Sequence, residues 1–225
     1  MYPVFFSDFD GTITEKDVII SIMEEFAPPK WKYIHNSLLS GEIDIDVGIR
    51  MMFNLIPSKL SKQIVHWCRE NVKVKQGFDD FLEFLDEIKI PFIIISGGVD
   101  LYIYPVLEKY LAKIHRIYSN RILLDKEFMD VNFVYRCANY CMKSCEVCKP
   151  YVIEKYYKNF NPKFYAGDGI TDLDACQFND IIFSAGGLYT YLKNRKLKGK
   201  KIVRFETFYD IIKALKEYGE GFYKG

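Results

Sequence analysis

Two aspartates, Asp8 and Asp10, follow a short apolar run near the start of the chain, in the sequence VFFSDFDGTIT. Successive residues of an extended strand point to opposite faces, but the chain turns where a strand ends, so both carboxylates can reach one pocket. A pair of aspartates is also common where it only stabilises a turn. Its meaning therefore depends on the polar residues that accompany it.

Three further groups of polar residues occupy comparable positions later in the chain. Ser96 follows an apolar run that is expected to end in a glycine-rich turn, and Gly97 begins a pair of glycines whose backbone N–H groups can form an anion-binding nest. Lys149 stands at the start of a predicted helix, where its ammonium group can approach a phosphate. The sequence GDGITD adds the carboxylates of Asp168 and Asp172 after another apolar run.

These residue types together favour one kind of chemistry. Carboxylates that gather at one edge of a sheet repel each other unless a cation lies among them, and Mg²⁺ prefers such hard oxygen ligands. A lysine and a nest of N–H groups facing that cation form a site for a dianionic ligand. The four groups therefore predict a Mg²⁺ site that binds a phosphoryl group.

The elements around these residues alternate between strand and helix, which predicts an α/β fold with a Rossmann-like parallel sheet and helices on both faces. In such sheets the ligand lies beyond the carboxyl ends of the strands. Residues 120–136 are typical of a hairpin. The expected strands span about 2–7, 90–98, 115–119, 163–167, 180–187 and 201–205, and the expected helices about 77–89, 100–112, 150–160, 171–178 and 207–218.

Residues 16–74 show helical patterns and no convincing strand. Asp17 is the expected N-cap of the first helix, and further helices are expected at about 31–39, 44–55 and 58–71. We predict a small helical domain inserted into an α/β core formed by residues 1–15 and 75–225.

Composition narrows the class of protein. The 225 residues suit one domain with a small insert, and 49% hydrophobic with 27% charged residues is ordinary for a globular protein with a core. The net charge of +1 gives no reason to expect nucleic acid or a membrane surface as a partner. The start of the chain lacks the basic region of a secretion signal, and the apolar runs are too short to cross a bilayer. We predict a cytoplasmic protein whose partner is a small molecule.

The motifs DFDGT, SGG, a lysine and GDGITD, in this order and with apolar strands before three of them, resemble the haloacid dehalogenase-type phosphatases. The resemblance implies that Asp8 is a nucleophile that forms an aspartyl-phosphate and that Asp10 is the general acid and base. It also implies that Mg²⁺ is held by the side chains of Asp8 and Asp168 and the backbone carbonyl of Asp10. Asp172 would support the metal ligands without binding the ion directly, or it would orient the lysine.

The same resemblance assigns the phosphoryl oxygens to Ser96, Gly97 and Lys149, with Thr12 supporting the loop through its hydroxyl. The inserted helices, residues 16–74, correspond to the family's cap, which excludes water and contacts the substrate. Asp17 is the acidic residue of this segment that could meet the substrate. The alternative is a plain helix N-cap.

Within the family, the stretches DFDGTITEKDVIISIMEEFAPPKW, FNLIPS, ISGGVDLYIYPVLE and CKP resemble the phosphatases of methionine salvage that act on 2-hydroxy-3-keto-5-methylthiopentenyl-1-phosphate. Phosphoserine and phosphoethanolamine/phosphocholine phosphatases share the four motifs and stay as alternatives. So do a phosphotransferase that uses the same aspartyl-phosphate and a non-catalytic sensor.

The sequence CANYCMKSCEVCK places four cysteines directly before Lys149. Their spacing is compatible with a tetrahedral Zn²⁺ site that fixes the loop carrying this lysine. Redox-sensitive thiols, a disulfide or inert packing are the alternatives. The residues concerned are Cys137, Cys141, Cys145 and Cys148.

Overall fold

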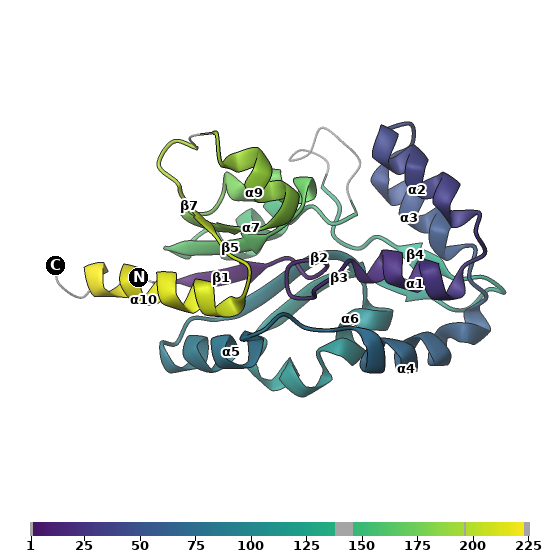
Figure 1. The fold of residues 1–225 in the computed structure, drawn as a ribbon, viewed down its shortest axis with the longest axis horizontal. Helices are drawn as coiled ribbons and strands as arrows, with labels where there is room; N and C mark the ends of the chain where they lie inside the picture. The colour runs from purple at the N-terminus through teal and green to yellow at the C-terminus, as the bar shows by residue number, and fades with distance from the viewer. Residues whose placement is uncertain (1, 138–145, 196, 223–225) are drawn as a thin grey trace.

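A seven-stranded sheet forms the centre of the molecule, in the order β4-β3-β2-β1-β5-β6-β7 (Figure 1). The computed structural model describes residues 2–137, 146–195 and 197–222. Neighbouring strands are parallel except β3 and β4, which are antiparallel at one edge. The strands are β1 (Val4–Ser7), β2 (Phe92–Val99), β3 (Arg116–Leu123), β4 (Asp130–Asn132), β5 (Lys163–Gly167), β6 (Ile181–Ser184) and β7 (Lys201–Arg204).

Helices cover both faces of this sheet, and the first four α-helices of the chain lie at one end of the molecule (Figure 1). The α-helices are α1 (Val18–Phe26), α2 (Trp31–Ser40), α3 (Ile45–Phe53), α4 (Ser61–Asn71), α5 (Phe78–Glu87), α6 (Asp100–Val106), α7 (Lys149–Tyr157), α8 (Leu173–Cys176), α9 (Gly186–Leu192) and α10 (Phe208–Phe222). Short 3₁₀ helices are η1 (Ser58–Leu60), η2 (Glu108–Lys113) and η3 (Ile170–Asp172).

Aromatic side chains fill the core on the two faces of the sheet. Phe5 of β1 packs against Phe81 of α5, with ring centroids 4.9 Å apart. Phe6 points to the opposite face and packs against Tyr157 of α7, at 5.1 Å. Each aromatic side chain contributes roughly 150–250 Å² of buried surface. This alternation confirms the predicted α/β fold with helices on both faces.

The segment Ser96-Gly97-Gly98 differs from its predicted form. Strand β2 was expected to end in a glycine-rich turn, but it continues to Val99. The register shifts here, because β2 advances four residues from Ile95 to Val99 while β3 advances two, from Tyr118 to Asn120. The prediction of a turn was wrong, since the glycines form a bulge inside the strand.

Other boundaries also moved. The strand expected at 115–119 and the first arm of the hairpin are one continuous strand, β3. The helix expected at 100–112 changes into the 3₁₀ helix η2, because Pro105 lacks the N–H group that an α-helix requires. The helix expected at 171–178 divides into η3 and α8. Helix α9 was not predicted, since it begins with two glycines, which are poor helix formers.

The chain enters and leaves the segment α1–α4 through two connections that lie side by side. Thr14 pairs with Val74 in an antiparallel bridge. The N–H of Glu15 donates to the carbonyl of Lys73 at 2.9 Å, and the N–H of Lys75 donates to the carbonyl of Ile13 at 2.8 Å. Both ends of the helical segment are therefore tied together close to the loop that follows β1.

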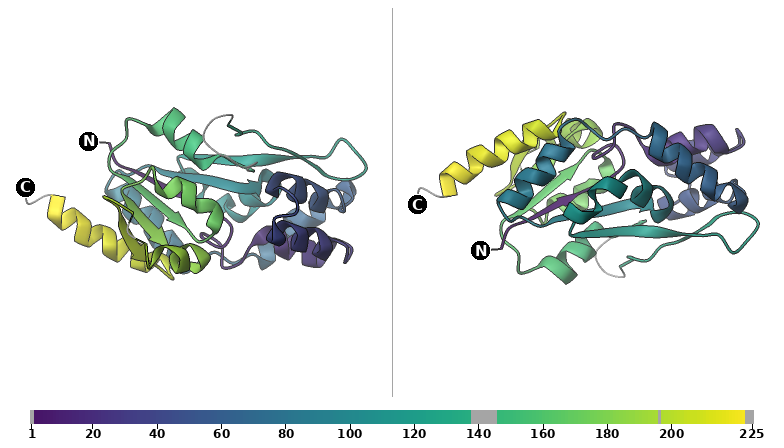
Figure 2. Two further views of the ribbon diagram at one scale, coloured as in Figure 1. Left: turned by 90° about the horizontal axis from the view of Figure 1, so that it is seen from above. Right: turned by 90° about the horizontal axis from the view of Figure 1, so that it is seen from below.

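The β3–β4 hairpin reaches along this helical segment (Figure 2). The N–H of Ser58 donates to the carbonyl of Glu127 at 2.8 Å. The guanidinium of Arg50 in α3 donates to the carbonyl of Val131 at 3.0 Å. The hairpin therefore contacts the helical segment as well as the sheet to which it belongs.

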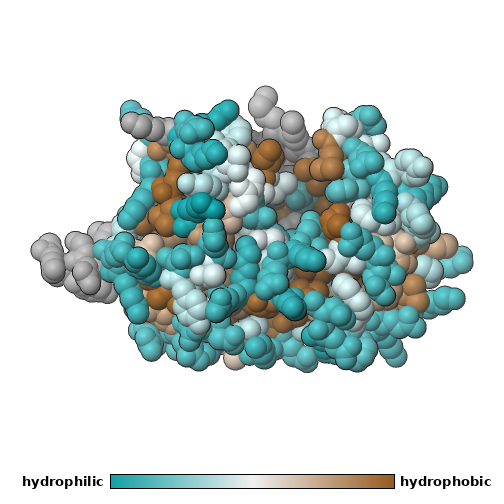
Figure 3. All heavy atoms as spheres, viewed as in Figure 1, coloured by the Kyte–Doolittle hydropathy of each residue, from teal (hydrophilic) through white to brown (hydrophobic). Residues whose placement is uncertain are grey.

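The face seen in Figure 3 is mostly hydrophilic, with hydrophobic residues in small separate groups. Within residues 2–137, 146–195 and 197–222, no helix has the length and apolar character needed to cross a membrane. Scattered surface hydrophobic residues of this kind are normal in globular proteins.

Candidate active site

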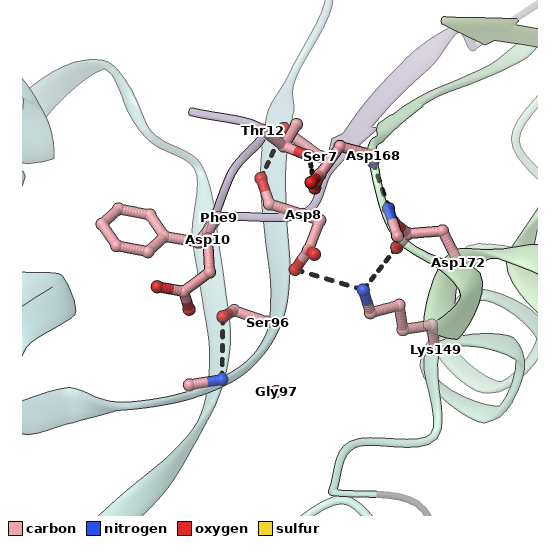
Figure 4. Close-up of polar contacts among 12 residues, drawn as sticks. Ser7, Asp8, Phe9, Asp10, Thr12, Ser96, Gly97, Lys149, Asp168 and Asp172 are labelled. Atoms are coloured by element: carbon pink, nitrogen blue, oxygen red, sulfur yellow. Dashed lines mark hydrogen bonds and ion pairs between the residues drawn. The ribbon is translucent and has the colours of Figure 1, made fainter. Parts of the chain in front are cut away.

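Strand β1 ends at Ser7, and the loop that follows carries the first motif (Figure 4). Asp8 is the first residue of this loop and is 8% exposed. Gly11 has φ +72°, and a Cβ atom there would lie 2.4 Å from Oδ2 of Asp168. Only glycine permits this approach. The hydroxyl of Thr12 donates to Oδ1 of Asp168 at 2.8 Å, so the loop is bound to the GDGITD motif.

Lys149 begins helix α7 and is 3% exposed. Its Nζ lies 3.1 Å from Oδ1 of Asp8 and 2.5 Å from Oδ1 of Asp172. Burial alone would lower the pKa of this lysine, but the two aspartates outweigh burial and raise it. Lys149 is therefore a fixed cation that contacts both carboxylates (Figure 4).

Both carboxylate oxygens of Asp172 accept hydrogen bonds from other groups of the protein. Its Oδ1 accepts from Lys149 and from the hydroxyl of Tyr165 on β5, both at 2.5 Å. Its Oδ2 accepts from the N–H groups of Asp168 and Gly169, each at 3.0 Å. With no exposed surface, Asp172 connects the lysine to the loop that carries Asp168.

Sequence reasoning missed Tyr165 as part of this network. Its hydroxyl is fully buried on a central strand, and a buried tyrosine hydroxyl usually has a hydrogen-bond partner. A tyrosine three residues before Asp168 on a strand ending at the site was the signal that could have revealed it.

The GDGITD motif and Asp8 form a group that can hold a metal ion. One carboxylate oxygen from each of Asp8, Asp168 and Asp172 lies within 4.8 Å of the others. Burial raises the pKa of Asp8 well above its usual value, against the opposing effect of Lys149, and burial also raises the pKa of Asp168. These carboxylates need further positive charge to stay ionised together, and their hard oxygens suit Mg²⁺.

The carboxyl group of Asp10 lies apart from this metal-binding group. It is on the opposite side of Asp8 from Lys149 (Figure 4). Its Oδ1 accepts from the N–H of Val18 at 2.9 Å, and its Oδ2 accepts from the hydroxyl of Tyr102 at 2.6 Å. Burial, with a smaller effect of Asp17, raises the pKa of Asp10 to about 8.

The second motif lies beside Asp8 and Asp10 (Figure 4). Ser96 is fully buried, and its Oγ accepts from the N–H of Gly98 at 3.0 Å. The carbonyl of Gly97 accepts from the side chain of Asn120 at 2.8 Å, which fixes the bulge against β3. One of the two N–H groups expected in the nest is thus bound within the motif.

Asp17 is the N-cap of α1, where its Oδ1 accepts from the N–H of Ile20 at 3.0 Å. This is the structural alternative given above, and contact with a substrate remains a prediction. Of the four cysteines, Cys137 and Cys148 are described and Cys148 is the N-cap of α7. Cys141 and Cys145 lie outside the described residues, so the zinc site stays a prediction.

Residues 5–177 match the haloacid dehalogenase-like hydrolase family. The chain belongs to this family. It is 37% identical over 211 residues to the 2-hydroxy-3-keto-5-methylthiopentenyl-1-phosphate phosphatases of Bacillus mycoides (strain KBAB4) and Bacillus cereus (strain 03BB102). Each comparison covers 94% of this chain and 94% of the relative. The family and these phosphatases confirm the prediction of a phosphoric monoester hydrolase.

Solved structures of similar fold include two phosphoserine phosphatases. One is a phospho-aspartyl intermediate analogue, with a TM-score of 0.70, 16% identity and coverage of 95% of this chain and 98% of the other. The second is the enzyme of T. onnurineus, with a TM-score of 0.68, 17% identity and coverage of 96% and 95%. At these identities the likeness shows the fold alone.

Proposed function

We propose that the chain is a Mg²⁺-dependent phosphomonoesterase that acts through an aspartyl-phosphate on Asp8. The observation that carries this proposal is the position of Asp8. Its carboxylate lies 3.1 Å from the buried ammonium of Lys149 and within 4.8 Å of oxygens of Asp168 and Asp172. A nucleophilic carboxylate, a fixed cation and further oxygen ligands are what phosphoryl transfer requires.

In the proposed reaction, Asp8 attacks phosphorus while the bond to the leaving oxygen breaks. Asp10 supplies a proton to that oxygen, which releases an alcohol. In the second step a water molecule attacks the aspartyl-phosphate and gives its proton to Asp10. Phosphate leaves, and the carboxylate of Asp8 is restored. Lys149 neutralises oxygen charge on phosphorus in both steps, with Ser96 and Gly97 as further contacts.

Asp8 and Asp168 would hold Mg²⁺ through side-chain oxygens, and Asp10 would contribute its backbone carbonyl. Bound there, the ion would neutralise charge on the phosphoryl oxygens. Asp172 belongs to the same group, but its oxygens already accept four hydrogen bonds, so we propose that it orients Lys149 rather than binding the ion directly. Thr12 would hold Asp168 in position through its hydroxyl.

We propose that residues 16–74 act as a cap over a core of residues 1–15 and 75–225. The paired connections at Thr14 and Val74 support this division, since they let four helices be inserted without interrupting the sheet. The cap would exclude water and contact the leaving group. Asp17, at the start of α1, is the acidic residue proposed to meet the substrate.

For the substrate we propose 2-hydroxy-3-keto-5-methylthiopentenyl-1-phosphate, and hence a role in methionine salvage. Identity of 37% over nearly the whole chain to phosphatases of this name supports it. We further propose a cytoplasmic location and no nucleic-acid or membrane partner, in keeping with the balanced charge of the chain.

The test is phosphate release with Mg²⁺ from a panel of esters that contains the methylthiopentenyl phosphate, phosphoserine, phosphoethanolamine and phosphocholine. Asp8→Asn is the blank, and Asp79→Asn is the matched control, because Asp79 contacts Tyr110 instead of the site. The highest kcat/KM for the methylthiopentenyl phosphate would support the proposal. A preference for an amino-bearing ester would contradict the proposed substrate but would remain consistent with the proposed mechanism. No release from any ester would contradict the phosphatase.

Phosphotransfer is measured in the same assay by adding an alcohol. If the proposal is right, phosphate goes to water even with the alcohol present. Transfer of most phosphoryl groups to the alcohol would instead favour a phosphotransferase.

A further inference from the structure

Asp10 is held on both of its carboxyl oxygens by groups that the family motifs do not include. The hydroxyl of Tyr102, in α6, donates to Oδ2 at 2.6 Å. The N–H of Val18, in the first turn of α1, donates to Oδ1 at 2.9 Å. Two directional bonds from two different helices fix both the position and the rotation of this carboxyl group.

Tyr102 is itself rigidly placed. Its side chain is fully buried, and its ring packs against Phe9 with centroids 5.9 Å apart. This packing aims the hydroxyl at Oδ2 of Asp10, where it acts as a donor from a fixed position.

Gly98 leaves the space in which this hydrogen bond forms. A Cβ atom on Gly98 would lie 2.0 Å from the hydroxyl oxygen of Tyr102 and 2.8 Å from Oδ2 of Asp10. No side chain fits at such distances. The second glycine of the SGG segment thus admits the tyrosine and the aspartate together, while the first residue of that segment, Ser96, lies beside Asp8 (Figure 4).

The two donors leave room for the proton that Asp10 must carry. A carboxyl group offers about four lone-pair positions, and the two hydrogen bonds occupy two of them. A proton can therefore sit on the carboxyl group while Tyr102 and Val18 hold it. Held in this way, Asp10 meets the requirement that a general acid be positioned before the reaction begins.

We infer that Tyr102 is a positioning residue for the general acid, with the first turn of α1 as the second anchor. The inference rests on the proposed function of Asp10. Tyr102 touches neither phosphorus nor the leaving oxygen. It orients the carboxyl group that gives its proton to the leaving oxygen as the P–O bond breaks and later accepts a proton from the attacking water.

The test compares two esters that differ in their need for the acid. The alkoxide of an alkyl phosphate is a poor leaving group and needs the proton from the acid. The nitrophenolate of p-nitrophenyl phosphate leaves readily without that proton. The comparison uses kcat/KM, because this quantity reports the steps up to release of the alcohol and excludes hydrolysis of the aspartyl-phosphate, which is the same for both esters. In Tyr102→Phe, which keeps the ring, kcat/KM for the alkyl ester should fall by roughly 10- to 100-fold, the scale of one lost hydrogen bond to an ionisable group. For p-nitrophenyl phosphate it should fall by less than about threefold.

Tyr110→Phe is the matched control, because it removes a buried tyrosine hydroxyl that donates to Asp79. It should leave the ratio of the two kcat/KM values unchanged. In an Asp10→Ala background, Tyr102→Phe should add no further loss for the alkyl ester. Gly98→Ala, which crowds the same pair, should change the ratio in the same direction as Tyr102→Phe.

An equal fall of kcat/KM for both esters in Tyr102→Phe, which leaves their ratio unchanged, would overturn the inference. The tyrosine would then be a packing residue. Phosphate release from both esters by the wild-type protein separates this failure from failure of the proposed function. In the latter case the wild-type protein itself would release no phosphate from either ester.

Discussion

The two sides of Asp8 are built in different ways. On one side Lys149 contacts both Asp8 and Asp172, and all three residues are buried. The groups that complete this side are Tyr165 and two N–H groups, and they all come from β5 and the loop after it. This side is ionic, closed and contained within the α/β core.

On the other side of Asp8, uncharged donors hold the carboxyl group of Asp10. Asp10 accepts from the hydroxyl of Tyr102 and the N–H of Val18, and neither of these donors carries a charge. One donor belongs to α6 and the other to the first helix of the inserted segment. A carboxyl group buried without an adjacent cation keeps its proton more readily than one that is paired with a lysine.

This difference indicates a division of work. A buried lysine is suited to holding the charge of a phosphoryl group throughout the reaction, whereas a carboxyl group in uncharged surroundings is suited to giving and taking a proton. Because one anchor of Asp10 lies in the segment α1–α4, the proposed proton transfer would depend on that segment, while the ionic side depends on residues outside it.

Asp8→Asn removes the nucleophile that both sides of the site serve, so it should have the largest effect on kcat. The amide cannot form the aspartyl-phosphate, so kcat should fall by roughly 10⁶-fold, the scale seen when a covalent nucleophile is removed. Phosphate release by purified protein measures it, with Asp79→Asn as control. Activity within tenfold of the wild type would exclude covalent catalysis by Asp8.

Removal of the divalent metal should have the second largest effect on kcat. Chelation takes away charge stabilisation of several kcal/mol at the phosphoryl oxygens, so kcat should fall by about 10³-fold or more. Added Mg²⁺ should restore it. Full turnover after exhaustive chelation would contradict the proposed cofactor.

Lys149→Met tests the ionic side alone. It should lower kcat by about 10²- to 10³-fold, as the loss of one charge-stabilising group does. It should also destabilise the fold by about 3–5 kcal/mol, because Asp172 is then buried without its cation. Denaturant unfolding measures this change. The ratio of kcat/KM for alkyl and nitrophenyl esters should change far less than in Asp10→Ala, and a similar change in both variants would remove the distinction between the two sides.

Tyr165→Phe should have the smallest effect. It removes one donor to Asp172 and leaves the other three, so the free energy of unfolding should fall by about 1–3 kcal/mol and kcat by about tenfold or less. Tyr118→Phe, which loses a hydroxyl contact to Tyr157 away from the metal-binding group, is the control. A loss of kcat as large as that of Lys149→Met would mean that the tyrosine does more than support Asp172.

The sequence predicted the sheet because its apolar runs are short, regularly spaced and separated by amphipathic helices. It also predicted that Asp8, Asp168 and Lys149 would meet, since strand ends converge at one edge of a parallel sheet. It did not predict the bulge at Ser96, because extra residues in a strand are defined by the register of its partner. Tyr102 and Tyr165 were missed because their hydroxyl contacts depend on side-chain direction, which spacing does not reveal.

The central claim is the covalent intermediate on Asp8, and trapping it is the most direct test. The protein is mixed with substrate and Mg²⁺, quenched in acid and reduced with borohydride, and its peptides are analysed by mass spectrometry. The account predicts that residue 8 is converted to homoserine in the wild type, and to a greater extent in Asp10→Asn with p-nitrophenyl phosphate, which forms the intermediate without the acid but still needs Asp10 for its hydrolysis. Turnover with no modified residue, or with the modification on another side chain, would contradict it.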